Sequence, residues 1–92
     1  MRILWSVPSL YDLQEIIEYI ALDNKKAAGR VVVQIRAAVD PLMTNPHLGR
    51  VGRLEGTREL ILGNLPYIVM YSLSSERVEI LRVIHTSRMW PE

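Results

Sequence analysis

The sequence has no cysteine, and this absence removes several classes of chemistry together. Without a thiol there is no disulfide, no cysteine nucleophile and no thiolate metal site. Two histidines alone do not make a metal-ligand cluster, so no metal is expected. The sequence also has no phosphate-binding loop, dinucleotide-binding glycine pattern or nucleophile elbow. We therefore expect no cofactor and a chain suited to a reducing compartment.

Excess charge of one sign and long apolar runs are also missing. Eleven Lys and Arg residues oppose ten Asp and Glu residues, which leaves a net charge of +1. Total charge therefore does not predict nucleic-acid binding, and any basic site must be local. The apolar start of the chain, up to Pro8, is shorter than a signal peptide or a membrane span. We expect a cytoplasmic protein with no membrane partner.

Apolar residues are abundant enough for one folded domain. The chain has 92 residues and a hydrophobic share of 49%, which suits a single core and is too little for two domains. We expect one domain over residues 1–92, so any function must fit on that one small core.

The first half of the chain predicts a strand followed by two helices. The run from Arg2 to Val7 is rich in strand formers, and Pro8 suits the first turn of a helix because it lacks an N–H. Apolar residues then recur at three- and four-residue steps in two segments, and Asn24 can cap the second. The two stripes are Leu10, Leu13, Ile16, Ile17 and Ile20, then Ala28, Val31, Val32, Ile35, Val39 and Leu42. Pro41 should bend or stop the second helix near Val39.

The second half predicts a loop followed by three strands. Glycines interrupt any period between His47 and Thr57, which is typical of a loop. Three short runs rich in β-branched and aromatic residues follow, separated by turn sequences, and predict a meander. They cover 58–62, 67–73 and 77–84. The order β-α-α-β-β-β predicts an α+β fold with a helical hairpin on one face of a small, mostly antiparallel sheet, and the other face partly open.

Several groups of residues, in this order and spacing, resemble the RelE/ParE superfamily of toxins from bacterial type II toxin–antitoxin systems. They are the helix pattern from Asp12 to Asn24, then Asn45-Pro46-His47-Leu48-Gly49-Arg50, then Thr57-Arg58-Glu59-Leu60 with Pro66-Tyr67 and Tyr71, and last Ile80-Leu81-Arg82-Val83-Ile84-His85 with Arg88-Met89-Trp90-Pro91. The resemblance covers nearly the whole chain. It implies a toxin that a cognate antitoxin neutralises by wrapping an amphipathic segment across it. Operator DNA would be contacted only through that antitoxin.

One branch of the superfamily cuts mRNA on the ribosome without a metal, and its site is incomplete here. For that branch, the resemblance implies a Tyr-Arg pair on the middle strand of the meander. The matching positions in this sequence are Tyr67 and Ile68. The arginine is missing, and loss of one charge-stabilising donor typically costs about 100- to 1000-fold in rate. The C-terminal tyrosine or lysine that such nucleases often use is replaced by Met89-Trp90-Pro91. The residues left for such a reaction are Arg58, Arg82, His85 and Arg88.

The ParE-like branch is similar in fold, lacks the nuclease residues and binds DNA gyrase. The missing arginine at position 68 and the missing C-terminal tyrosine or lysine both favour this branch. Its functional element is a binding surface. Arginine and tryptophan dominate interface hot spots, and this chain offers both. The candidate target-binding residues are Arg50, Arg53, Arg58, Arg82, Arg88 and Trp90. The ribosome with its mRNA is the alternative target, and a non-toxic member that only binds its antitoxin is a third hypothesis.

Several candidates also have purely structural interpretations. Arg58 and Glu59 could do no more than form cross-strand pairs. Arg82 could lie on a solvated strand face, and His85 could satisfy a strand-end hydrogen bond.

Two tyrosines complete the set of candidates. Tyr67 and Tyr71 lie four residues apart on one predicted strand, so they should share a face of it. There they would pack in the core or contact the antitoxin.

Overall fold

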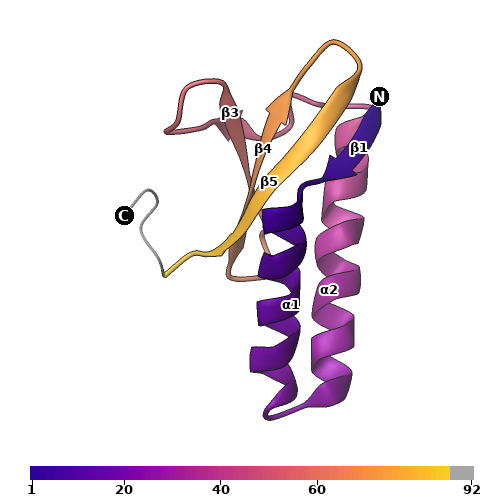
Figure 1. Cartoon of the computed structure of the whole chain (residues 1–92), viewed down its shortest axis with the longest axis vertical. Helices are drawn as coiled ribbons and strands as arrows, with labels where there is room; N and C mark the ends of the chain where they lie inside the picture. Colours follow the sequence, from indigo (N-terminus) through magenta and orange to yellow (C-terminus); the bar gives the residue numbers. More distant parts are fainter. Residues whose placement is uncertain (88–92) are drawn as a thin grey trace.

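A computed structural model describes residues 1–87, and this part of the chain folds into two α-helices, one 3-10 helix and five strands. The elements are β1 (Arg2–Trp5), α1 (Val7–Ala21), α2 (Lys25–Val39), η1 (Asp40–Met43), β2 (Arg50–Val51), β3 (Thr57–Ile61), β4 (Tyr67–Leu73) and β5 (Arg77–His85). The hairpin of α1 and α2 lies on one side of the sheet, while β3 and the loop before it project away from the helices (Figure 1). The predicted α+β fold is confirmed.

Both helices begin where a side chain caps the first turn. The Ser6 hydroxyl accepts a hydrogen bond from the N–H of Ser9 at 3.1 Å, and Pro8 occupies the opening turn of α1. Asn24 does the same for α2 by accepting from the N–H of Ala27 at 3.0 Å. The predicted cap at Asn24 is confirmed. Because α1 already starts at Val7, the first strand is two residues shorter than predicted.

The second helix changes form at the predicted proline. Helix α2 ends at Val39, and the chain tightens into η1, which contains Pro41 in its first turn. Proline cannot donate the backbone hydrogen bond that would continue an α-helix. The carbonyl of Pro41 then accepts from the N–H groups of Thr44 and Asn45, at 3.2 and 2.9 Å. The bend expected near Val39 therefore takes the form of a 3-10 turn.

The five strands lie in the order β1-β5-β4-β3-β2. β1 is parallel to β5, and the other three pairs are antiparallel, so the three predicted strands do form a meander. The prediction of a plain loop from His47 to Thr57 is wrong in one respect, because Arg50–Val51 pairs with β3 as an edge strand. A strand of two residues flanked by glycines has too little alternation to be detected in a sequence.

The hydrophobic core lies between the helical hairpin and the sheet. Its fully buried large side chains include Ile35, Leu42, Tyr71 and Ile80. The predicted α1 stripe is wrong at Leu10, which is exposed. In that turn the buried position belongs to Ser9, whose hydroxyl donates to the carbonyl of Ser6 at 2.7 Å. The first turn of α1 is therefore packed through a small polar side chain.

A β-bulge in β5 decides which of its side chains face the helices. Ile80 pairs with Tyr71 and Arg82 pairs with Met70, so Leu81 is an extra residue on β5. The core residues of β5 are Val78 and Ile80 before the bulge and Val83 after it. Because side chains alternate along a strand, Arg82 lies on the face that the helices leave open.

Candidate functional site

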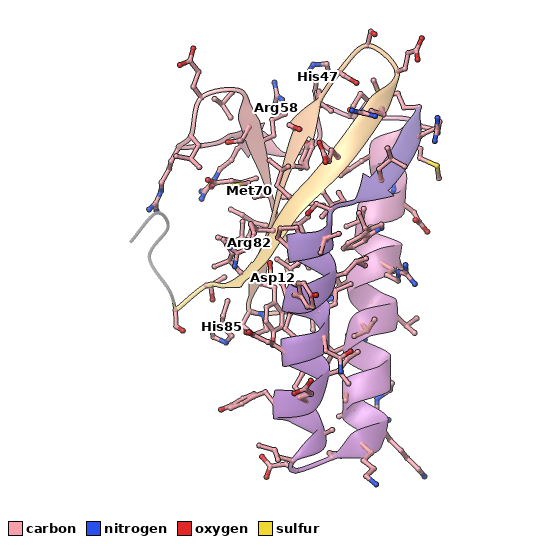
Figure 2. The ribbon with its side chains drawn as sticks, in the orientation of Figure 1. Asp12, His47, Arg58, Met70, Arg82 and His85 are labelled. Carbon is pink, nitrogen blue, oxygen red and sulfur yellow. The ribbon has the colours of Figure 1, made fainter. Side chains whose placement is uncertain are left out.

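Arg82 is tied to helix α1 through Asp12. Its Nε and Nη2 atoms donate to the two Asp12 carboxylate oxygens at 2.7 and 3.0 Å. The backbone N–H of Val83 donates to the same carboxylate at 2.9 Å. Figure 2 shows the two charged side chains meeting between β5 and α1. The hydrogen bond to Asp12 raises the pKa of Arg82 above its ordinary value. Arg82 is therefore more than a solvated side chain.

Asp12 accepts a hydrogen bond from β5 at the part of its edge that lies beyond the end of β1. β1 ends at Trp5, so within residues 1–87 the edge of β5 beyond Ile80 has no strand beside it. Ser6 supplies two partners there, since its N–H donates to the Ile80 carbonyl at 3.0 Å and its hydroxyl to the Leu81 carbonyl at 3.0 Å. Asp12 supplies the third partner, by accepting from the N–H of Val83. The start of α1 thus satisfies the exposed backbone of β5.

Glu59 is a buried carboxylate on the other side of the sheet from the helices, and it holds the edge strand β2. Arg50 donates to it from Nε and Nη2 at 3.1 and 2.9 Å, and the N–H of Arg53 donates at 3.2 Å. The Glu59 side chain is 4% exposed, whereas that of Arg50 is 51% exposed. Burial raises the pKa of Glu59, but the hydrogen bonds and charges of both arginines outweigh it and leave this pKa below its ordinary value.

The turn before β2 is held by two side chains from the sheet. The Tyr71 hydroxyl donates to the Pro46 carbonyl at 2.8 Å and accepts from the N–H of Gly49 at 2.8 Å. Nη1 of Arg58 donates to the Gly49 carbonyl at 2.7 Å. A Cβ on Gly49 would lie 2.7 Å from the Tyr71 hydroxyl, so only glycine fits. The motif that ends in Gly49-Arg50 is therefore a fixed turn leading into β2.

The open face of the sheet carries a row of isoleucines. Ile61 pairs with Ile68, and Ile68 pairs with Ile84, so the three side chains lie side by side across β3, β4 and β5. The next row is Glu59, Met70 and Arg82. Position 68, at which the resemblance implies an arginine for the nuclease branch, thus lies in the middle of an apolar row.

The two tyrosines and His85 lie in or against the core. Tyr67 and Tyr71 are both buried in the core cluster, as the packing interpretation predicts. Burial, with a smaller effect of Tyr19, raises the pKa of Tyr67. His85 packs edge-on against Tyr67 with ring centroids 5.3 Å apart. Its Nδ1 accepts the N–H of Ser87 at 3.1 Å, which is the strand-end hydrogen bond expected of it.

The structure thus divides the predicted site residues into separate places. Arg50, Arg53 and Arg58 surround β2 and the start of β3, whereas Arg82 lies at the contact with α1. Arg88 and Trp90, the other two target-binding candidates, lie outside the described residues.

Asp12 and Glu59 were missed as site residues by sequence reasoning. The only sign of them in the sequence is an acidic residue inside an apolar pattern. The partner of Asp12 is Arg82, which lies 70 positions further along the chain.

Within residues 1–87 no group of three or more His, Asp and Glu side chains is placed to hold a metal ion. The helices of the same part of the chain are neither long nor apolar enough to cross a membrane.

The two-helix hairpin on a five-stranded mixed sheet matches the fold of a solved ParE/RelE-like structure. The family model described as the ParE toxin of the type II toxin–antitoxin system parDE matches residues 3–90. The chain therefore belongs to the ParE toxin family, and the predicted resemblance is confirmed.

Three known proteins are similar over almost their whole length. Toxin Y4kP of Sinorhizobium fredii is 47% identical over 91 residues, which are 99% of this chain and 94% of that protein. Toxin RelE2 of Caulobacter vibrioides is 31% identical over 88 residues, 96% of this chain and 98% of that one. A solved structure of the chromosomal ParDE TA system from P. aeruginosa has a TM-score of 0.83 and 27% identity, and covers 92% of this chain and 95% of its own.

Proposed function

We propose that this toxin of a type II toxin–antitoxin system acts by binding DNA gyrase and not by cutting RNA. One observation supports this proposal above others: the candidate nuclease side chains of residues 1–87 do not converge. A metal-free cut of RNA needs a base and cations within hydrogen-bond reach of the same phosphate. Here the Arg82 guanidinium is held by Asp12, and position 68 is an isoleucine.

The other candidates lie elsewhere on the sheet. Arg58 pairs with Tyr71 in register, whereas Arg82 pairs with Met70, the neighbouring residue on β4. Alternation along β4 puts these two arginines on opposite faces. His85 lies at the far end of β5 and packs against buried Tyr67. A substrate phosphate that contacts Arg82 on the open face is therefore out of reach of Arg58.

Membership of the ParE family implies an antitoxin partner. We propose that this antitoxin neutralises the toxin, and that the pair contacts operator DNA only through the antitoxin. A protein with gyrase as its target would act in the cytoplasm. The arginines at β2 and β3 supply the kind of side chain that dominates protein interfaces.

The proposal is tested by giving the purified, antitoxin-free protein to gyrase, plasmid DNA and ATP, beside a ribosome–mRNA cleavage assay. We expect loss of supercoiling or accumulation of cleaved DNA complexes, with intact mRNA. Codon-phased cuts in the mRNA with normal gyrase activity would overturn the proposal. Omission of ribosomes controls for a contaminating nuclease.

Ribosome-dependent cleavage is the second candidate function, and the 31% identity to toxin RelE2 is the observation that favours it. In that case Arg82, His85 and Arg88 would have to suffice without an arginine at position 68. A third candidate, a non-toxic member that only binds antitoxin, predicts normal growth when the chain is expressed alone.

A further inference from the structure

The two helices of the hairpin carry charges of opposite sign. Helix α1 contains acidic residues and no basic one, whereas α2 contains basic residues and no acidic one. Within residues 1–87, Asp12 is the only one of these charged residues that forms an ion pair, and its partner is Arg82 on β5. The two helices pack on each other, yet no ion pair joins them in this part of the chain. Their other charges therefore remain available to a second molecule.

These charges lie on one face of the hairpin together with exposed apolar residues. Residues at steps of three and four share one face of a helix, and the face opposite the buried residues points away from the core. On both helices that face is formed by four exposed residues with the same spacing. The outer face of the hairpin consists of Val7, Tyr11, Gln14 and Glu18 on α1, and Lys26, Arg30, Val33 and Ala37 on α2.

The order of charged and apolar residues along the outer face is the same on both helices. The hairpin turns at Asp23, so residues equally far from Asp23 on the two helices lie at about the same height. Glu18 is therefore level with the stretch between Lys26 and Arg30. Further from the turn, α1 exposes Val7 and Tyr11, and α2 exposes Val33, which is 67% exposed. Each helix is thus charged near the turn, with opposite signs, and apolar at its far end.

A second copy of the chain fits this pattern. A two-fold axis parallel to the helices places α1 of each copy on α2 of the other, antiparallel and with the two turns at the same end. Glu18 of one copy then meets Lys26 and Arg30 of the other copy, and the apolar ends meet each other. We infer that the outer face of the hairpin binds a second copy of this chain and forms a symmetric four-helix dimer.

Self-complementarity favours a second copy over a different partner. A two-fold interface requires one surface to match itself at every level. The outer face does so, because acidic lies opposite basic and apolar lies opposite apolar under the same rotation. A different protein, the antitoxin included, needs only to match this surface with its own sequence. Such a partner gives no reason for opposite charges to lie at the same height on α1 and α2.

The size of the outer face indicates a weak dimer. A helix of 15 residues is about 22 Å long, and two packed helices are about 20 Å wide, which gives about 440 Å² for each copy. This area is at the lower end for specific interfaces and suits a transient dimer. The open face of each sheet stays uncovered, because the hairpin lies on the other side of the sheet (Figure 1). The inference is therefore independent of the proposed function.

Charge reversal on either helix tests the pairing in the full, antitoxin-free chain. Glu18→Lys places a cation opposite two cations, and the double change Lys26→Glu with Arg30→Glu places two anions opposite Glu18. Each variant should self-associate about tenfold more weakly or worse, because like charges across an interface repel. Sedimentation equilibrium over a series of protein concentrations measures the effect, and circular dichroism melting verifies that each variant is folded.

A matched control changes the charge elsewhere. Glu55→Lys makes the same change of charge at an exposed residue of the loop between β2 and β3. It should alter self-association less than about twofold, because exposed charges far from an interface are screened by salt.

Mixing the two charge-reversed variants tests the predicted register. In the mixed dimer the new lysine of one variant faces the two new glutamates of the other. On the second side, the native Glu18 of one variant faces the native Lys26 and Arg30 of the other. The mixture should therefore associate about as tightly as the unmodified chain, although neither variant does so alone. Misfolding of a variant cannot produce this rescue.

Several outcomes would overturn the inference. The unmodified chain could be a monomer at every concentration measured, or its self-association could be insensitive to both charge reversals. Weaker binding of the cognate antitoxin by the variants, with unchanged self-association, would assign the outer face to the antitoxin. Assemblies that grow beyond two copies would show a head-to-tail contact in place of the two-fold axis. Gyrase binding is measured separately, so the proposed function stands or falls independently of these results.

Discussion

The carboxylate of Asp12 on α1 bridges the guanidinium of Arg82 and the backbone N–H of Val83, 70 and 71 positions further along the chain. One side chain thus closes the edge of β5 where β1 ends and ties the helical hairpin to the sheet. It also determines what Arg82 can do, because an arginine that already binds a carboxylate at two points has less capacity left for a substrate phosphate.

Removal of the Asp12 carboxylate should destabilise the protein. Asp12→Ala leaves the Val83 N–H and the partly buried Arg82 without this partner, and hydrogen bonds to a charged group contribute about 1.5–3 kcal/mol. We expect a loss of about 2 kcal/mol in the free energy of unfolding, measured by urea denaturation. Asp23→Ala, at an exposed aspartate in the turn between the helices, should change this free energy by less than about 0.5 kcal/mol. Equal effects of the two substitutions would show that the bridge contributes nothing.

The ion pair of Glu59 and Arg50 should make stability depend on pH in the acidic range. The pKa of Glu59 is lower in the folded protein than its ordinary value of 4.5. The stabilisation is therefore complete above pH 4.5 and is lost as the pH falls through the lower folded pKa. Glu59→Gln removes this contribution, so the difference in unfolding free energy between the two proteins should shrink between pH 6 and pH 3. A difference that stays constant over this range would mean that the pair does not contribute through its charge.

Gly49 and Gly29 should respond in opposite directions to alanine. A Cβ on Gly49 would lie 2.7 Å from the Tyr71 hydroxyl and 2.8 Å from the Glu59 carbonyl, whereas a Cβ on Gly29 meets nothing within 4 Å. Gly49→Ala should cost about 1–3 kcal/mol of stability through overpacking. Gly29→Ala, inside α2, should stabilise by up to about 1 kcal/mol because alanine favours the helix. Thermal melting measures both, and a stable Gly49→Ala variant would show that the turn can move.

The fold was largely predictable because its signals are local. The caps at Ser6 and Asn24, and the break at Pro41, depend on residues within four positions of each other. The alternating pattern of the last three strands is likewise local. These signals suffice for the order of the elements and for the side of each helix that packs on the sheet.

The site was less predictable because its contacts are set by strand register. The bulge at Leu81 reverses which residues of β5 face the core, and nothing in the alternation of the sequence marks it. The pairing of Arg50 with Glu59 depends on a two-residue strand that the glycine pattern hides. Asp12 was visible only as a polar position on an amphipathic helix.

Placing at position 68 the arginine that the resemblance implies for the nuclease branch should not by itself produce nuclease activity. Ile68→Arg places a cation in the isoleucine row, one row away from Arg82 on the same face. Arg82 remains bound to Asp12, and Arg58 remains on the other face at Gly49, so a single added charge does not assemble a phosphate site. We expect intact mRNA in a primer-extension assay with ribosomes, for the variant as for the unmodified chain. Ile61→Arg, in the same row, controls for non-specific RNA binding by an added charge. Codon-phased cuts by Ile68→Arg alone would show that this one position had withheld the activity, and that the pairing of Arg82 with Asp12 does not prevent catalysis.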